Sequence, residues 1–300
     1  MCCLFGLMDY KGSLSSGGKS RIINILARAC EVRGIDATGI AYNSGGSLRI
    51  YKRPLPAHKM RFRIPGDTKA VMGHTRMTTQ GSEKKNRNNH PFPGKAGGRA
   101  FALAHNGILH NDRELRHSLD LPKTRIQTDS YVAVQLLEQQ KTLDLNSLKD
   151  MAEQVEGSFV FTVLDEQNRL YFVKGENPMC IYRYPRTGMI LYASTETILK
   201  GALRTLNLPL EPPEELRLGW GETCCIAPDG SVERGTFQVR HTPFLWRPYV
   251  FPMEKPDRGY VQSLMDMAGV FGHTRQDVAQ MLEDGLDPEE IEEYFYCGGF

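Results

Sequence analysis

The sequence has no two cysteines at the short spacings of a zinc site or a disulfide framework. Its seven cysteines stand at positions 2, 3, 30, 180, 224, 225 and 297, an odd number without any C-x-x-C pair. Because disulfides are rare in reducing compartments, this pattern favours an intracellular protein with free thiols. We expect neither a bound metal nor another cofactor.

Long apolar runs and a charge excess are also missing. No apolar stretch reaches the ~18 residues of a membrane-spanning helix, and the first residues lack the layout of a signal peptide. The formal net charge of +2 gives no general reason to expect nucleic acid or membrane binding, so we expect a cytoplasmic protein. Residues 49–63 nevertheless hold six Lys or Arg and no acid, which fits a phosphate-binding patch or, preferably, a solvated basic hairpin.

Hydrophobic spacing changes along the chain and predicts an α+β fold. Residues 12–18 read as a Ser/Gly loop before the first helix. Helical spacing predicts helices at about 20–32, 131–140, 146–156 and 195–206, whereas residues 2–8, 100–104, 158–194 and 222–226 favour strands. Because strands and helices come in blocks rather than in strict alternation, we expect stacked layers of helix and antiparallel sheet.

The composition changes near residue 240. A segment rich in proline and aromatic residues follows, and residues 277–294 then hold eight acids and no Lys or Arg. Their spacing faintly suggests a helix-turn-helix, but such an acidic element would repel DNA phosphates. The predicted organisation is a domain over 2–238, a linker over 239–258 and a short acidic helical extension over 259–300 that serves docking or packing.

Cys2 directly follows the initiator methionine. Methionine ahead of a small residue is normally removed, which would give Cys2 both a thiol and a free α-amine. That amine has an ordinary pKa of ~7.7–8, so it can accept the thiol proton near neutral pH. The structural alternative is that Cys2 is an ordinary small residue at the start of a strand.

Three further motifs follow apolar segments. They are Gly73-His74-Thr75-Arg76, His105-Asn106-Gly107 and Thr128-Asp129. Asn-Gly between apolar strands is also typical of a hairpin turn, and Asp129 is also placed to cap a helix. The long polar segment at 78–91 is a candidate lid.

Together and in this order, these stretches resemble the class II glutamine amidotransferase domain, an N-terminal-nucleophile (Ntn) hydrolase. The resemblance is greatest to the glutaminase domain of glucosamine-phosphate synthase. The matching stretches are Met1 to Leu4, Val32 to Gly39, Gly73 to Gly81, His105 to Leu109 and Thr128 to Ser130. The likeness covers roughly residues 2–235 and implies a four-layer αββα sandwich of two antiparallel sheets, here with a small helical C-terminal extension.

The resemblance implies a role for each matching residue. Cys2 would attack the amide of glutamine, while the Asn106 side chain and the Gly107 N–H would bind the oxyanion. Arg76 would bind the substrate carboxylate and Asp129 its ammonium. The remaining substrate-binding residues would be Arg33, Gly34, Thr79 and His105.

Three positions depart from the family pattern: Cys3 stands for Gly, Met77 for Trp and Gln80 for His. The residues after 240 are too few for any of the domains that usually consume the ammonia. We therefore expect a glutaminase that passes ammonia to a separate partner protein or has no acceptor. Two alternatives remain, a hydrolase of γ-glutamyl amides or peptides and a non-catalytic binding or regulatory subunit.

Overall fold

The computed structural model describes residues 2–239, 258–284, 286 and 288–297. The chain separates into two compact units, residues 1–241 and 242–300. Apart from its first and last residues, the linker predicted at 239–258 lies outside the described residues, so its boundaries stay predictions.

The larger unit is built on two sheets in which each recorded strand pair is antiparallel. The first has seven strands in the order β11 (Glu214–Glu215), β9 (Cys180–Tyr184), β10 (Met189–Ala193), β1 (Cys3–Asp9), β4 (Ala70–Arg76), β2 (Ala37–Ser44) and β3 (Ser47–Arg53). The second has six strands in the order β13 (Val232–Thr236), β12 (Glu222–Ile226), β8 (Leu170–Lys174), β7 (Gly157–Asp165), β6 (Arg99–Leu109) and β5 (Phe92–Ala96).

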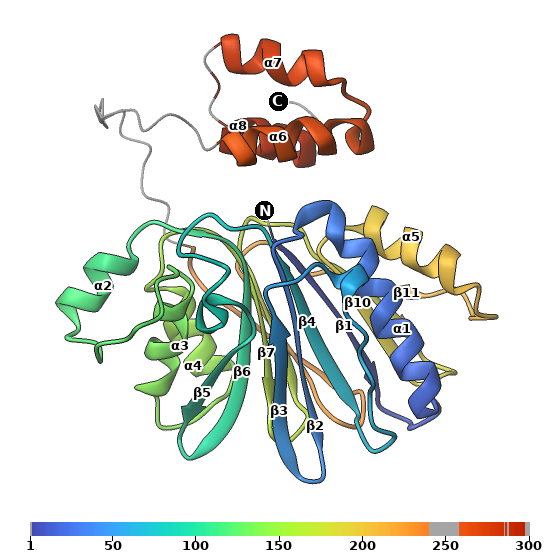
Figure 1. Cartoon of the computed structure of the whole chain (residues 1–300). Coiled ribbons are helices and arrows are strands. Elements are labelled where there is room, and N and C mark those ends of the chain that lie inside the picture. Colours follow the sequence, from blue (N-terminus) through green and yellow to red (C-terminus); the bar gives the residue numbers. More distant parts are fainter. Residues whose placement is uncertain (1, 240–257, 285, 287, 298–300) are drawn as a thin grey trace. The chain divides into compact units, whose positions relative to one another are not determined.

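Helices cover the outer face of each sheet, as Figure 1 shows. The helices α1 (Ser16–Ala29) and α5 (Glu196–Leu206) pack on the first sheet. On the second sheet lie α3 (Tyr131–Glu138) and α4 (Leu145–Ala152), and α2 (Asp112–Ser118) precedes them in the chain. Short 3-10 turns are η1 (Cys30–Arg33), η2 (Ala57–Lys59) and η3 (Asn86–Asn88). The predicted αββα sandwich is therefore confirmed.

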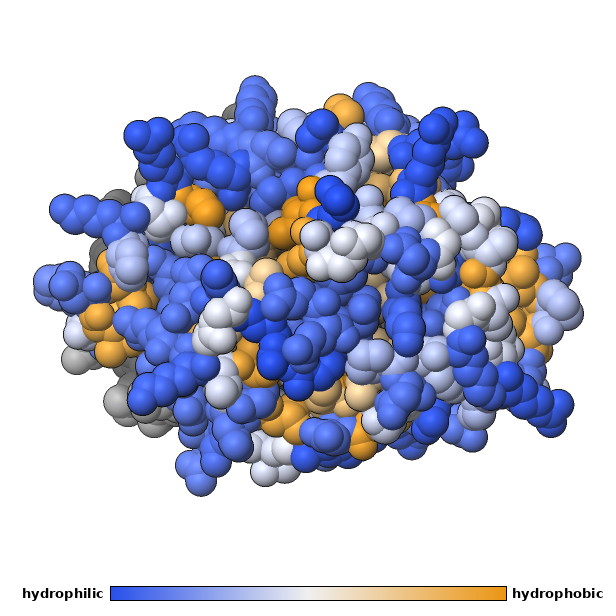
Figure 2. Space-filling view, turned by 90° about the horizontal axis from the view of Figure 1, so that it is seen from below, coloured by the Kyte–Doolittle hydropathy of each residue, from blue (hydrophilic) through white to orange (hydrophobic). Residues whose placement is uncertain are grey.

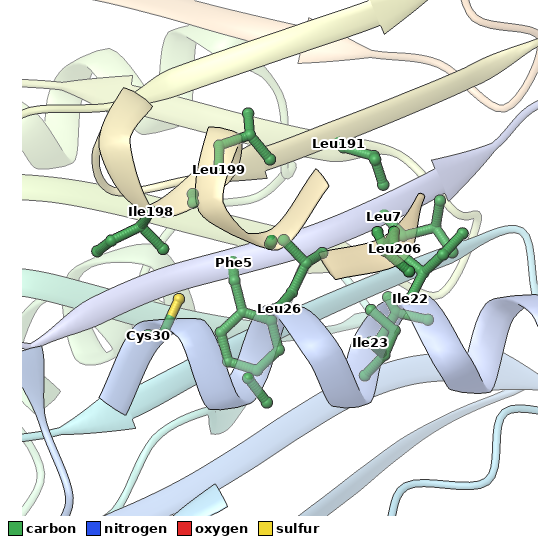
Figure 3. Packing of buried hydrophobic residues seen from close by; sticks show 14 of the residues in the cluster. Phe5, Leu7, Ile22, Ile23, Leu26, Cys30, Leu191, Ile198, Leu199 and Leu206 are labelled. Carbon is green, nitrogen blue, oxygen red and sulfur yellow. The ribbon is translucent and has the colours of Figure 1, made fainter. Parts of the chain in front are cut away.

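Strand β1 lies inside the first sheet, paired with β4 on one side and β10 on the other. Side chains alternate across a strand, so Phe5 and Leu7 pack on α1 and α5 (Figure 3), whereas Leu4 and Met8 face the second sheet. Both faces of β1 are buried for this reason. By the same alternation Cys2 shares the face of Leu4, between the two sheets.

Two local predictions need correction or limits. Helix α1 begins at Ser16, inside the predicted loop at 12–18, because the Ser15 hydroxyl accepts a hydrogen bond from the Gly18 N–H and caps the helix there. In the basic stretch 49–63, only the first part, in β3, forms a hairpin with β2. The rest includes η2 and runs beside α1 outside both sheets.

The smaller unit contains α6 (Arg258–Met267), η4 (Ala268–Phe271), α7 (Arg275–Glu283) and α8 (Pro288–Cys297). Its own core includes Leu264, Val278 and Ile291, in agreement with the predicted helical extension. Among all described helices, none has the length and apolar character needed to cross a bilayer. On the face seen in Figure 2, hydrophilic side chains predominate and hydrophobic ones form small separate groups.

Candidate active site

Cys2 is half-buried immediately before β1. Its Sγ lies 3.5 Å from the carbonyl oxygen of Met77, and its own carbonyl accepts a hydrogen bond from Arg33 Nε at 3.0 Å. Burial raises the pKa of the Cys2 thiol, although the nearby Arg76 charge acts in the opposite direction. The thiol therefore needs a base to form the thiolate at neutral pH.

Arg33 ends η1, and Gly34 after it lies against the end of β4. The Arg33 side chain is fully buried, with its guanidinium at the backbone of Cys2. A Cβ added to Gly34 would lie 2.5 Å from the carbonyl carbon of Arg76 and 2.7 Å from the Met77 nitrogen. Only glycine lets this segment lie so close to Arg76.

Asn106 and Gly107 do not form a hairpin turn, so that alternative is wrong. Strand β6 runs straight through them, and they pair with Val160 and Phe159 of β7. Gly107 has a φ of 141°, and a Cβ there would lie 2.0 Å from the Ser158 carbonyl oxygen. Only glycine therefore fits at this position, two residues before the end of β6.

The Asn106 side chain is fully buried and only partly hydrogen-bonded. Its Nδ2 donates to Ser194 Oγ at 3.4 Å, and its Oδ1 has no hydrogen-bond partner among the described residues. Ser194 Oγ also accepts the Leu4 N–H at 2.9 Å, which ties β6 to β1. Ser194 was missed by the sequence reasoning, although a polar residue directly after the apolar strand β10 was a visible signal.

Arg76, at the end of β4, is buried and engaged with the segment that follows it. One Nη donates to Asn89 Oδ1 at 2.7 Å, and the other donates to the carbonyls of Gln80 at 2.6 Å and Gly81 at 2.9 Å. A guanidinium has five N–H groups, so two remain for another acceptor. Asn89 was also missed, because nothing in its local sequence separates it from the other asparagines around it.

Asp129 is not a helix cap, so that alternative is wrong as well. Helix α3 begins at Tyr131, and the residue before it makes no capping hydrogen bond. The Asp129 carboxylate instead accepts the Leu109 N–H at 2.7 Å, and its own N–H donates to Gln80 Oε1 at 2.8 Å. Gln80, one of the three departures from the family pattern, therefore connects the 78–91 segment to Asp129.

The segment 78–91 contacts Arg76 through Gln80, Gly81 and Asn89. It contacts Asp129 through the Gln80 side chain. Thr79 within it is exposed, and the neighbouring Thr78 N–H donates to Asp36 Oδ2 at 2.7 Å. Asn88 and Asn89 are buried, so this polar segment is packed at its far end. Its action as a lid stays a prediction.

Three buried histidines, His74, His90 and His105, lie behind these residues. His105 Nδ1 is 2.8 Å from Ser130 Oγ, and its carbonyl oxygen is 3.0 Å from His74 Nε2. Burial lowers the pKa of all three, that of His74 to about 3. They are therefore neutral at physiological pH, and His105 contacts the residue beside Asp129.

Cys3 does not lie beside the Cys2 thiol in the site. It belongs to the cluster of Phe5 and Cys30 between the first sheet and its helices, on the opposite face of β1. Over the described part of the chain, no group of three or more His, Cys, Asp or Glu is arranged to hold a metal ion.

Known proteins resemble this chain in sequence and in fold. Residues 74–201 match the model of a glutamine amidotransferase domain. The glutamine–fructose-6-phosphate aminotransferase of Bacillus licheniformis is 28% identical over 187 residues, which cover 59% of this chain and 30% of that protein. The 7-cyano-7-deazaguanine synthase 2 of Sulfurisphaera tokodaii is 28% identical over 206 residues, covering 65% and 44%. The chain thus spans less than half the length of these relatives.

Among solved structures, the glutamine phosphoribosylpyrophosphate amidotransferase of B. subtilis matches with a TM-score of 0.63 and 20% identity. The match covers 80% of this chain and 50% of that chain, and it extends the agreement in fold over most of the larger unit. The family resemblance inferred from the motifs is confirmed. Residues 74–201 are therefore assigned to a glutamine amidotransferase domain, and the chain shares the fold of the phosphoribosylpyrophosphate amidotransferase.

Proposed function

We propose that the protein hydrolyses the side-chain amide of glutamine with Cys2 as nucleophile, after removal of Met1. The Cys2 α-amine then takes the thiol proton as general base, and later gives a proton to the departing ammonia. The sulfur forms a thioester with the glutamyl group, which water cleaves to release glutamate. A nearby amine is needed because burial alone disfavours the thiolate.

Asn106 and Gly107 are the proposed oxyanion donors. The amide of Asn106 spends one N–H on Ser194, so its second N–H is left for the negative oxygen of the tetrahedral intermediate. Gly107 has no side chain that could cover its backbone N–H. These donors come from β6 of the second sheet, and Cys2 immediately precedes β1 of the first.

Arg76 and Asp129 are the proposed clamp for the amino-acid end of the substrate. The two free N–H groups of Arg76 suit a carboxylate, and the Asp129 carboxylate, which accepts the Leu109 N–H, keeps further lone pairs for an ammonium. Gln80 contacts both residues of the clamp, through its carbonyl and its side chain. The proposal also assigns substrate binding to four further residues, Thr79, Arg33, Gly34 and His105.

The observation that carries the proposal is the convergence of these residues at one point. Cys2 Sγ lies 3.5 Å from the carbonyl oxygen of Met77, the residue after Arg76. Gln80 is hydrogen-bonded to both Arg76 and Asp129. A cation, an anion and a buried thiol around one point are what recognition and attack of an amino acid's amide require. Ammonia released there would pass to an acceptor or partner enzyme that the structure does not identify.

The test is the intact mass of the full chain before and after a diazoketone analogue of glutamine, with the Cys2→Ala variant in parallel. We expect loss of Met1 and one covalent adduct, absent in Cys2→Ala. Cys3→Ala is the matched control, because that thiol faces the helices, and it should keep the adduct. A retained Met1 without an adduct would contradict the proposal and favour a binding or regulatory subunit.

Steady-state kinetics then separate the two hydrolase hypotheses. The intact clamp accepts the same carboxylate and ammonium from glutamine and from a γ-glutamyl peptide. We expect a higher kcat/KM for glutamine than for γ-glutamyl dipeptides. The reverse order would assign the protein to γ-glutamyl hydrolysis.

A further inference from the structure

A groove of about 740 Å³ lies away from the site residues, between α1 and the segment at 58–63. It includes the part of the basic stretch that does not form the hairpin. The groove is open on the outer helical layer of the larger unit, where α1 lies in Figure 1.

The wall at 59–64 is held in place by side chains of α1. Asn24 accepts the Phe62 N–H at 3.0 Å and donates to the Phe62 carbonyl at 2.8 Å, while Ser20 Oγ accepts the Ile64 N–H at 2.8 Å. These bonds replace a neighbouring strand, so the segment is fixed although it belongs to no sheet.

Burial along this wall alternates with the period of a strand. Met60, Phe62 and Ile64 are buried in the core below α1. The intervening residues Lys59, Arg61 and Arg63 are exposed. Arg61 and Arg63 lie on the extended stretch after η2, so their side chains point to one side of the wall about 6.6 Å apart, and Lys59 ends η2 just before them.

The charge in the groove is of one sign. The opposite wall adds the exposed Arg21 and Arg28 of α1, and none of the residues lining the groove is acidic. His58 at one end is bonded to Glu31 at 3.0 Å. The side chains of Arg28, Lys59, Arg61 and Arg63 have no acidic partner within the described ranges. The net charge of +2 hides this concentration, since residues 242–300 hold eleven of the 35 acids but four of the 37 Lys and Arg.

The spacing of these cationic side chains favours an extended acidic peptide over single-stranded nucleic acid as the bound anion. In an extended peptide, carboxylates on alternate residues are also about 6.6 Å apart and point to one side. Single-stranded nucleic acid sites usually add exposed aromatic rings on which bases stack. The aromatic residue in this groove, Phe62, is only 2% exposed, so that feature is missing from its lining.

We propose that this groove binds an extended acidic segment of a partner protein, with carboxylates on alternate residues facing Arg61 and Arg63 and with Lys59 beside them. The recognition is an arginine-cluster contact in which planar guanidinium forks bind carboxylates. It is independent of whether Cys2 is catalytic, because no residue of the groove belongs to the proposed active site.

The experiment measures binding of a fluorescent synthetic peptide, about ten residues long with alternating glutamate and serine, to the full chain by fluorescence anisotropy. We expect saturable binding that weakens as salt is added, because exposed charge pairs are screened. A peptide of the same composition with its glutamates in one block should bind more weakly, since its carboxylates do not match the spacing of Arg61 and Arg63.

The variant Arg61→Glu/Arg63→Glu should weaken binding by about tenfold or more, as two attractive pairs become repulsive. Lys123→Glu/Lys141→Glu is the control, with the same change of net charge at exposed positions outside the groove. All these positions are exposed, and circular dichroism confirms that each variant is folded. Equal losses in both variants, or equal affinity for both peptides, would overturn the proposal. Tighter binding of single-stranded oligothymidylate than of the alternating peptide would overturn it too.

Discussion

Acid should unfold the larger unit because His74 resists protonation in the folded protein. Its burial, with the Arg76 charge adding to the effect, lowers the pKa of His74 from 6.5 to about 3. Between these values the unfolded chain binds a proton that the folded chain does not, so stability is lost as the pH falls through 6.5. At pH 4.5 the unfolded histidine lies about 2 units below its pKa, which corresponds to about 2.7 kcal/mol relative to pH 7.5.

The assay is urea unfolding at pH 4.5 and 7.5, followed by circular dichroism, for the wild type and His74→Gln. Glutamine retains an N–H that can reach the His105 carbonyl but does not titrate. The difference in unfolding free energy between the two pH values should shrink by about 2.7 kcal/mol in His74→Gln. Any loss of stability that is independent of pH cancels in this comparison.

The control is His117→Gln, because His117 is exposed on α2, and it should leave the difference between the two pH values unchanged. If His74→Gln shows the same difference as the wild type, His74 is protonated within the folded protein at pH 4.5. The reasoning from burial would then be refuted.

Three predictions concern the reaction itself. Gly34→Ala should raise KM for glutamine about tenfold with a smaller change in kcat, because its Cβ would displace the backbone of Arg76. Ser194→Ala should lower kcat about tenfold at unchanged KM, because the Asn106 amide loses an acceptor that orients it, and Ser194→Thr should restore part of the rate. The pH profile of kcat/KM should rise through ~7.7–8, the pKa of an α-amine, without a histidine limb near 6.5, since burial keeps the site histidines neutral. A limb near 6.5 would argue against the Cys2 amine as the base.

Much of the fold followed from hydrophobic periodicity in the sequence. Strand β1 and the hairpin of β7 and β8 show alternation or continuous apolar runs because both sheets are buried on both faces. The start of α1 was missed because the Ser15 cap and two glycines after it resemble a loop, and packing on the first sheet outweighs their low helix propensity.

The sequence names the candidate site residues but does not predict their contacts. Asn-Gly and Thr-Asp locally suggest a turn and a helix cap, but contacts with distant residues prevent both. Pairing with β7 keeps β6 straight, and the Asp129 carboxylate accepts the Leu109 N–H instead of capping α3. The sequence did not predict roles for Ser194 and Asn89, because the side chains that they contact lie in other elements. No local sequence pattern marks a residue that holds another side chain in place.

The straight course of β6 through Asn106 and Gly107 also bears on the chemical lifetime of the protein. An asparagine followed by glycine deamidates readily when the glycine nitrogen can swing onto the side-chain amide, which is one reason asparagine is thermolabile. Pairing with β7 holds the two residues extended and denies them that geometry. Each unfolding event removes this protection, so heat should convert Asn106 to aspartate and isoaspartate. The damage would place a negative charge where the proposed oxyanion forms, and refolded molecules would then accumulate as inactive protein of almost unchanged mass.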